Sequence, residues 1–430
     1  MSFIHSVQAR QILDSRGNPT VEVDVWLDDG ARGRALVPSG ASTGKAEAVE
    51  LRDDDPQLFQ GRGVLQAVDN AQQTLSRFVQ GIDARDQARV DQRLVEADGT
   101  GDRSRLGANA LLGVSMAAAR AASRSAGLPL YRYLGGARAA TLPVPMVNIL
   151  SGGLHTDGML DFQDYQMIPL RARSFAEALC DVAAVYRAMK DVLQSNGYFV
   201  PGVADEGGYA PQLPANETGF EMMIQAFERA GLKPGRDAAI AVDVAATHFQ
   251  EGRHYRLSAE KTSLSSSEMA DRLERWQSQY PIISIEDGLG EEDWKGWKNL
   301  TGRLSNRCQL LGDDLFVTNY KRLRRGIQEG IANAVLIKMN QAGTLTETLE
   351  TLELARRHGY RTVVSARSGE TEDDFMADLA VATGAGQIKI GAITRSERLA
   401  KYNRLLRIEE SLGARAHYPG AAQFGECKSN

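Results

Sequence analysis

Charged residues stand at the ends of six short apolar segments in the second part of the chain. A buried parallel strand is a continuous apolar run, and the carboxyl ends of such strands carry the chemistry in α/β barrels. We therefore expect these side chains to converge on one rim. A single one could be a solvated strand end or a helix N-cap, but three carboxylates and three cations at successive strand ends exceed what capping requires. The six residues are Asp243, Glu286, Asp313, Lys338, Arg367 and Lys389.

The expected rim has the residue types for a metal-assisted proton abstraction. Three carboxylates repel one another unless a dication neutralises them, and ligation by oxygen alone selects Mg²⁺ over Zn²⁺. Near the metal, Lys389 and Arg367, we expect Lys338 to have a pKa below the usual lysine value of about 10.4. A neutral lysine beside Mg²⁺ suits removal of a weakly acidic proton next to a carboxylate. Because Arg367 and Ser368 suit a phosphate, the spacing predicts a Mg²⁺-dependent, carbanion-forming enzyme for a small phosphorylated acid.

One residue interrupts the polar cluster that contains Arg367. The β-branched run Thr362–Val364 is followed by Ser365, Arg367 and Ser368, which suit anion binding at a strand end. Ala366 lies among them and contributes only a methyl group. Position 366 therefore has no polar side chain, although the residues on both sides of it are polar.

The elements that must position these residues differ between two parts of the chain. Beyond residue 138, short strands alternate with amphipathic helices, which predicts a parallel α/β sheet with enough units for a closed eight-stranded barrel. We therefore predict an α/β fold with a small N-terminal α+β cap domain, residues 1–137, and a barrel domain, residues 138–430. The predicted strands are 239–244, 282–285, 309–311, 334–337, 362–364 and 387–390.

The predicted cap begins with a β-hairpin over residues 4–37 and continues with helices. Between them, residues 38–45 are rich in small side chains, which indicates either a flexible surface loop or a mobile lid. The segment does not fit a phosphate-binding P-loop, because three residues instead of four separate Gly40 from Gly44 and Ala46 stands where Ser or Thr is required. The predicted helices are 64–79, 88–97 and 108–126.

The composition excludes several other classes of protein. The chain has 430 residues, 43% of them apolar and 24% charged, with a net charge of −5. Those values are typical of a globular protein of about two or three domains, and they show no footprint for nucleic acid or membrane binding. Three widely spaced cysteines argue against a disulfide framework or a thiolate zinc site. With no signal-peptide pattern, we expect a cytoplasmic protein.

At these residues the chain resembles the enolase (phosphopyruvate hydratase) family. The resemblance runs from about Ala9 to about Leu412 and implies a small α+β cap followed by an enolase-type barrel in which one early strand is antiparallel. The segments that carry it are QILDSRGNPTVE (11–22), VPSGASTG (37–44), DEGGYAP (205–211), SIEDG (284–288), GDDL (312–315), KMNQ (338–341), RSGETED (367–373) and GQIK (386–389).

The resemblance also implies roles for particular residues. Lys338 would be the base at C2 of the substrate, and Glu206 the acid that helps the hydroxyl group leave C3. Ser39 on the lid would help bind a second Mg²⁺ together with the substrate phosphate. The other implied roles are a structural, substrate-carboxylate-binding Mg²⁺ site of Asp243, Glu286 and Asp313, a phosphate site of Arg367 and Ser368, a carboxylate site at Lys389, and a loop histidine, His155.

The chain departs from the family pattern mainly where hydroxide leaves and water is handled. The family has histidine at Ala366 and glutamate at Asp164; it usually has Ser-Glu at 247–248 and Thr at Ile390. Aspartate in place of glutamate retracts a carboxylate by about 1.5 Å, and a misplacement of about 1 Å at a reacting centre can cost on the order of 10²-fold in rate. Loss of an imidazole that transfers protons costs a further 10²–10⁴-fold, roughly.

Three functions are compatible with this pattern. The first is a diverged paralogue that still enolises a 2-phosphoglycerate-like acid, for which the carboxyphosphonoenolpyruvate synthases of phosphonate pathways are the closest analogy. The second is an ordinary glycolytic enolase that tolerates both substitutions. The third is a non-catalytic binding protein on an enolase scaffold. For each, the resemblance implies a homodimer or a higher homo-oligomer.

Overall fold

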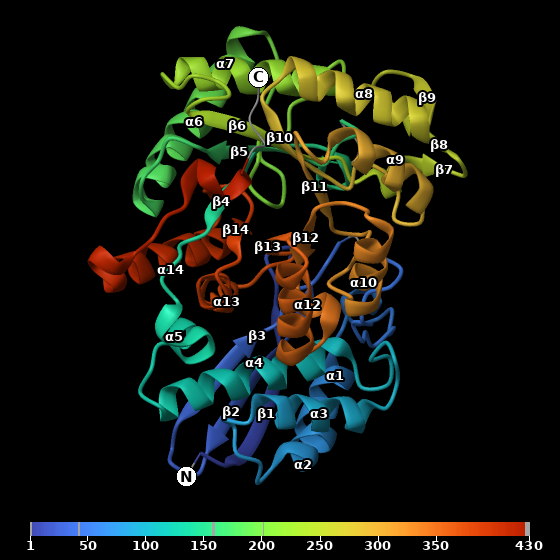
Figure 1. The fold of residues 1–430 in the computed structure, drawn as a ribbon. Helices are drawn as coiled ribbons and strands as arrows, with labels where there is room; N and C mark the ends of the chain where they lie inside the picture. Colours follow the sequence, from blue (N-terminus) through green and yellow to red (C-terminus); the bar gives the residue numbers. More distant parts are fainter. Residues whose placement is uncertain (1, 42–43, 157–159, 201, 426–430) are drawn as a thin grey trace.

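A computed structural model describes residues 2–41, 44–156, 160–200 and 202–425. The N-terminal segment forms a cap of one sheet with helices, and the remainder forms a closed barrel surrounded by helices (Figure 1). This arrangement confirms the predicted fold class of a small α+β cap followed by an eight-stranded α/β barrel. In the part of the chain that the structure describes, no helix has the length and apolar character needed to cross a bilayer.

The cap sheet is an antiparallel meander of β1 (Ile4–Leu13), β2 (Pro19–Leu27) and β3 (Arg32–Leu36). One face packs against helix α4 (Ala108–Ser125) at very short range. A Cβ atom on Gly33 of β3 would lie 1.9 Å from the Ala117 carbonyl oxygen, so only glycine permits this approach.

The cap helices confirm the apolar periodicity of the sequence. The predicted helix 64–79 is continuous but has a π-helical middle, with α1 (Leu65–Asp69), a π-helix (Asn70–Leu75) and α2 (Ser76–Val79). Helix α3 (Gln87–Asp98) follows, with the Asp86 carboxylate accepting the Arg89 N–H as its N-cap. Helix α5 (Leu130–Gly135) ends the cap side of the chain.

The barrel closes in the strand order β10-β11-β12-β13-β14-β4-β5-β6. β5 runs antiparallel to both β4 and β6, as the resemblance implied, and the remaining pairs are parallel. The strands are β4 (Val144–Ser151), β5 (Asp164–Pro169), β6 (Ala238–Asp243), β10 (Ile282–Glu286), β11 (Gln309–Gly312), β12 (Ala334–Ile337), β13 (Arg361–Ser365) and β14 (Gly386–Lys389).

Amphipathic helices cover the outside of the barrel (Figure 1). A small sheet of β7 (Gln250–Glu251), β8 (His254–Leu257) and β9 (Thr262–Ser265) precedes helix α8, which begins with a Ser265–Glu268 capping box. The barrel helices are α6 (Phe175–Ser195), α7 (Asn216–Arg229), α8 (Ser266–Gln279), α9 (Trp294–Leu304), α10 (Tyr320–Glu329), α11 (Met339–Ala342), α12 (Leu345–Arg357), α13 (Phe375–Thr383) and α14 (Ser396–Leu412).

The inside of the barrel contains both apolar and polar side chains. Apolar side chains such as Met146, Ile168 and Leu311 form a separate buried cluster. In another part of the interior, the side-chain amides of Gln309 and Gln387 exchange two hydrogen bonds of 2.9 and 2.8 Å. The charged residues at the strand ends therefore stand on a packed floor and not over an open pore.

Candidate active site

The structure brings the six predicted strand-end charges onto one rim, with the two signs on different sides. The carboxylates end or directly follow the consecutive strands β6, β10 and β11, and the cations follow or end β12, β13 and β14. Asp243 and Glu286 are register partners in the β6–β10 pair. This confirms that the side chains converge, because parallel neighbours in a closed barrel present their carboxyl ends at the same edge.

Lys389 bridges two of the rim carboxylates. Its Nζ donates to Asp243 Oδ2 at 2.7 Å and to both oxygens of Glu286, at 2.9 and 2.8 Å. Burial, followed by the charge of Asp243, raises the pKa of Glu286 well above its usual value. Burial opposes the charge of Lys389, but the two carboxylates outweigh it and raise its pKa. This part of the rim therefore places two buried carboxyl groups against one ammonium group.

Lys338 pairs with the third rim carboxylate. Its Nζ donates to Asp313 Oδ2 at 2.5 Å, and Gln341 Nε2 donates to the other oxygen at 3.1 Å. Burial, Arg367 and Lys389 all lower the pKa of Lys338, but the Asp313 charge outweighs them and the pKa is raised. The prediction of a lowered pKa was made for Lys338 beside a bound metal ion, Lys389 and Arg367, and for that arrangement it stays a prediction.

An acidic cluster that could hold a metal ion lies beside this pair. Ligand atoms of Asp287, Asp313 and Asp314 all lie within 4.8 Å of one another. Asp287 already accepts the backbone N–H groups of Asp313 and Asp314, at 3.0 and 2.7 Å. The predicted set of Asp243, Glu286 and Asp313 is not one of the close groups among the described residues. The three carboxylates of this predicted set offer only oxygen ligands, which fit Mg²⁺. The assignment of a Mg²⁺ site to Asp243, Glu286 and Asp313 stays a prediction.

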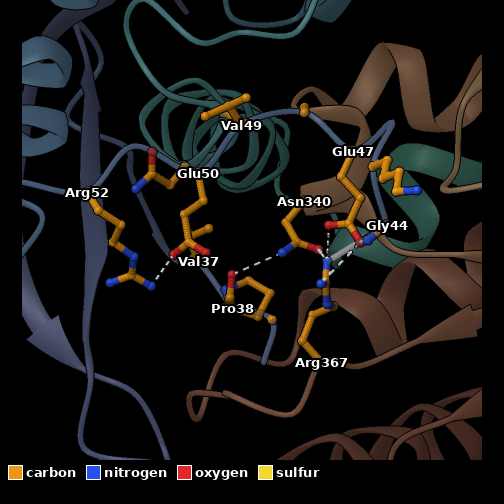
Figure 2. Close-up of a pocket in the computed structure, with 14 residues that line it drawn as sticks. Val37, Pro38, Gly44, Glu47, Val49, Glu50, Arg52, Asn340 and Arg367 are labelled. Carbon is orange, nitrogen blue, oxygen red and sulfur yellow. Dashed lines mark hydrogen bonds and ion pairs between the residues drawn. The ribbon is translucent and has the colours of Figure 1, made fainter. Parts of the chain in front are cut away.

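The expected phosphate end lies where the cap meets β13. Arg367 is 3% exposed, and its Nη1 donates to Glu47 Oε2 at 2.9 Å and to Asn340 Oδ1 at 3.0 Å (Figure 2). Ser368 Oγ accepts the Ala41 N–H at 2.8 Å. A cavity of about 490 Å³ between cap and barrel reaches Arg367. The two predicted anion binders are thus held by cap residues and, for Arg367, also by Asn340 of α11.

Ser39 is held on the barrel by its backbone and by its side chain. It forms an antiparallel bridge with Gly369, with N···O distances of 2.8 and 2.9 Å. Its hydroxyl donates to Asp14 Oδ2 at 2.7 Å, so the carboxylate fixes the direction of the hydroxyl lone pairs. Of the predicted lid 38–45, residues 42–43 lie outside the described residues.

The expected leaving-group end gathers His155, Asp164 and Glu206, whose ligand atoms lie within 4.8 Å of one another. The Asp164 carboxylate accepts from Ser151 Oγ at 2.8 Å through Oδ1. Its buried Oδ2 has no hydrogen-bond partner in the described part of the chain. Burial, and then the charge of Glu206, raises the pKa of Asp164 to about 7, against the opposing effect of His155.

Ala366 is buried, with 6% of its surface exposed, and its backbone N–H donates to the Lys389 carbonyl at 2.9 Å. The backbone therefore continues the β13–β14 pairing past Ser365, while the side chain belongs to the apolar core. The methyl group that the sequence placed among polar residues is thus buried and is not a solvent-exposed substitution.

Asp205 lies where it stabilises the protonated form of His155, because its Oδ1 lies 3.0 Å from Nδ1 of the imidazole. Burial disfavours that charge, but the contact with Asp205 and the charges of Asp164 and Glu206 outweigh it. Together they raise the pKa of His155 to about 9. We therefore expect the His155 imidazole to be protonated at neutral pH, beside the side chains of Asp164 and Glu206.

A pH titration should detect this charge. We expect the His155 imidazole to titrate near pH 9 in a histidine NMR spectrum and Asp205→Asn to lower that pKa, because Asp205 stabilises the protonated ring. A folded-state pKa above the ordinary value of about 6.5 stabilises the fold fully below pH 6.5, roughly, and this contribution is lost as the pH rises through about 9.

The control for this titration is Asp191→Asn, which removes an exposed carboxylate on α6. His155→Gln assigns the signal among the six histidines of the chain. A His155 pKa near 6.5 in the unchanged protein, or the same pKa with Asp205→Asn, would contradict the charge assignment.

Several residues that contact the site had no predicted role. Asn148 on β4 donates to Glu206 Oε2 at 3.0 Å and accepts from Gln166 Nε2 at 3.1 Å. Asn340 and Asp205 lie in segments that carried the family resemblance, so the motif could have identified them. Asn148 and Glu47 gave no signal of their own, because only the barrel closure and the cap docking bring them to the site.

The cap and barrel, with opposed charges at the carboxyl ends of the strands, define the class of capped barrel enzymes. Two family models match the chain in the same order. The model for the enolase N-terminal domain matches residues 4–134, and the model for the enolase C-terminal TIM barrel domain matches residues 139–426. The chain therefore belongs to the enolase family.

Proposed function

We propose that this protein enolises 2-phosphoglycerate or a closely related phosphorylated acid and carries out a modified second half-reaction. One contrast carries the proposal. The proton-abstraction side has all its carboxylates and lysines on one rim, whereas the leaving-group side has a buried methyl group at Ala366 and a short carboxylate at Asp164. If the protein had lost its activity through random substitutions, we would expect changes on both sides of the site.

In this proposal the chain's own residues divide the work between binding and proton transfer. Arg367 and Ser368 bind the phosphate, and Lys389 binds the carboxylate once it is released from Asp243 and Glu286. Lys338, once it is released from Asp313 and has lost its own proton to solvent, accepts the C2 proton as a neutral amine. Bound Mg²⁺, held by Asp243, Glu286 and Asp313 with Ser39 at a second site, would supply charge stabilisation for the substrate oxygens.

The leaving-group side is proposed to have changed its reaction. Glu206, held by Asn148, is the proposed acid at C3. His155 with its raised pKa is a fixed cation beside it, and Asp164 has one oxygen engaged by Ser151. These features support a specialised paralogue such as a carboxyphosphonoenolpyruvate synthase, a product assignment that rests on analogy within the family.

The experiment that tests the proposal measures exchange of the C2 proton of 2-phosphoglycerate in deuterated water, together with formation of phosphoenolpyruvate. We expect exchange in the presence of Mg²⁺ and its loss on chelation with EDTA, with recovery when Mg²⁺ is returned. We expect phosphoenolpyruvate formation to be far slower than exchange. Calcium chloride at the same ionic strength controls for general salt effects.

The two alternatives give different results in the same experiment. Dehydration at an ordinary enzymic turnover of about 1–10³ s⁻¹ would identify a glycolytic enolase that tolerates Ala366 and Asp164. Absence of exchange in saturating Mg²⁺ would leave a non-catalytic binding protein on this scaffold. The assay therefore separates all three functions.

Three further features of the protein remain proposals. We infer a division into domains at residues 137 and 138, which falls between the two matched segments. We also propose a homodimer or a higher homo-oligomer and a cytoplasmic location, without nucleic-acid or membrane partners. Sedimentation of the purified chain tests the oligomeric state directly.

A further inference from the structure

Two side chains connect Arg367 to both ends of the segment 38–45. On one side, Arg367 Nη1 donates to Asn340 Oδ1 at 3.0 Å, and Asn340 Nδ2 donates to the Pro38 carbonyl at 3.3 Å. On the other, Arg367 Nη1 donates to Glu47 Oε2 at 2.9 Å, and Glu47 Oε1 accepts the Gly44 N–H at 2.9 Å. Figure 2 shows both connections meeting at the guanidinium group.

The Glu47 connection is a desolvated ion pair. The side chains of Glu47 and Arg367 are 7% and 3% exposed, so each charge depends on the other, and the loss of one leaves a buried charge unpaired. Glu47 Oε1 also accepts from Gln341 Nε2 at 3.1 Å, and the same nitrogen lies 3.1 Å from Asp313 Oδ1. Glu47 therefore contacts Gly44, the Arg367 guanidinium and Gln341, and Gln341 in turn donates to the rim carboxylate Asp313.

A phosphate would compete for the same donors. Guanidinium groups bind phosphate in a bidentate manner through the N–H groups that carboxylates and amides otherwise accept. When a phosphate takes up N–H groups of Arg367, the bonds to Glu47 and Asn340 must shift. Because these two side chains also contact Gly44 and Pro38, the shift reaches both ends of the segment.

We propose that Glu47 and Asn340 are positioning residues that couple phosphate occupancy at Arg367 to the two ends of segment 38–45, each acting on one end. This inference rests on the proposed phosphate-binding role of Arg367. It assigns Asn340 to the Pro38 end and Glu47 to the Gly44 end. Ser39 and Ala41, which contact Gly369 and Ser368, place residues 39–41 on the barrel.

The test is amide hydrogen exchange of peptides covering 34–41 and 44–52, with and without 2-phosphoglycerate and Mg²⁺. In the unchanged protein we expect the ligand to alter exchange at both ends by about tenfold, the scale of an ordinary coupling between sites. Glu47→Gln should remove most of the change in 44–52 and keep that in 34–41. Asn340→Asp, which retains an acceptor for Arg367 but loses the N–H given to Pro38, should do the reverse.

The control is Glu96→Gln, an exposed carboxylate on α3, which should leave both ligand-induced changes unaltered. Thermal unfolding verifies that each variant is folded, and the ligand Kd is measured for each. If both variants keep the ligand-induced change at both ends, the coupling is refuted while the proposed phosphate site stands. If Arg367→Gln leaves the Kd unchanged, the phosphate site itself fails, and the coupling with it.

Discussion

Lys338→Ala is expected to abolish exchange of the C2 proton of 2-phosphoglycerate and to leave the fold intact. The proposed base is 13% exposed and contacts Asp313, so alanine removes both the proton acceptor and the partner of a buried carboxylate. A positioned general base contributes about 10²–10⁴-fold to the rate, and we expect a loss of at least that size. The measurement is the disappearance of the C2 proton signal by NMR in deuterated water.

A second readout separates lost chemistry from lost structure. Because the substitution leaves Asp313 without its ammonium partner, we expect a lower free energy of unfolding in EDTA. We expect Mg²⁺ to restore that stability, since a bound cation replaces the missing charge. Lys298→Ala, at an exposed position of α9, is the matched control and should change neither quantity. Undiminished exchange in a folded Lys338→Ala protein would refute the assignment of the base.

The double variant Ala366→His, Asp164→Glu is expected to gain dehydration of 2-phosphoglycerate to phosphoenolpyruvate. Glutamate extends the carboxylate of residue 164 by about 1.5 Å, and histidine restores a group able to transfer protons next to Arg367. Each change acts on the leaving-group side, so we expect a combined gain of about 10²–10⁴-fold in kcat for dehydration. The rate of C2 exchange should change much less.

The single variants and a stability measurement complete this experiment. Ala366 is buried in the apolar core, so a histidine there is expected to overpack the site. Overpacking lowers the free energy of unfolding by about 1–3 kcal/mol, and thermal unfolding detects that loss. Ala366→Ser, a small polar residue, controls for polarity without an imidazole and should give no gain. If the folded double variant dehydrates no faster than the unchanged protein, the divergence from enolase activity lies elsewhere in the chain.

Much of the architecture could be predicted from the sequence, because it depends on local patterns. The apolar run Ala334–Ile337 is a barrel strand with the bounds that were predicted, and the other predicted strands differ by at most one residue at each end. The strands β4 and β5 were not predicted from the pattern. They run antiparallel to each other and end in polar loops, so the regular strand–helix alternation that revealed the others does not include them.

The candidate site was partly predictable for the same reason. Asp243, Glu286 and Lys389 could be assigned to one rim, since the carboxyl ends of parallel strands meet whatever the loops do. The charge states of the rim residues could not be predicted from the sequence. The pKa of Lys338 depends on its burial and on the charges around it, first that of Asp313, and these follow from packing that no local pattern contains.

The sequence by itself determined the fold class, the rim of opposed charges and the two departures at Ala366 and Asp164. Only the tertiary structure decided which groups hold the reactive side chains. Asp205 contacts His155 and Glu47 contacts Arg367, through pairs that are far apart in the chain. These contacts arise because the barrel closes and the cap docks on its rim, and burial between the two makes each of those charges depend on its partner.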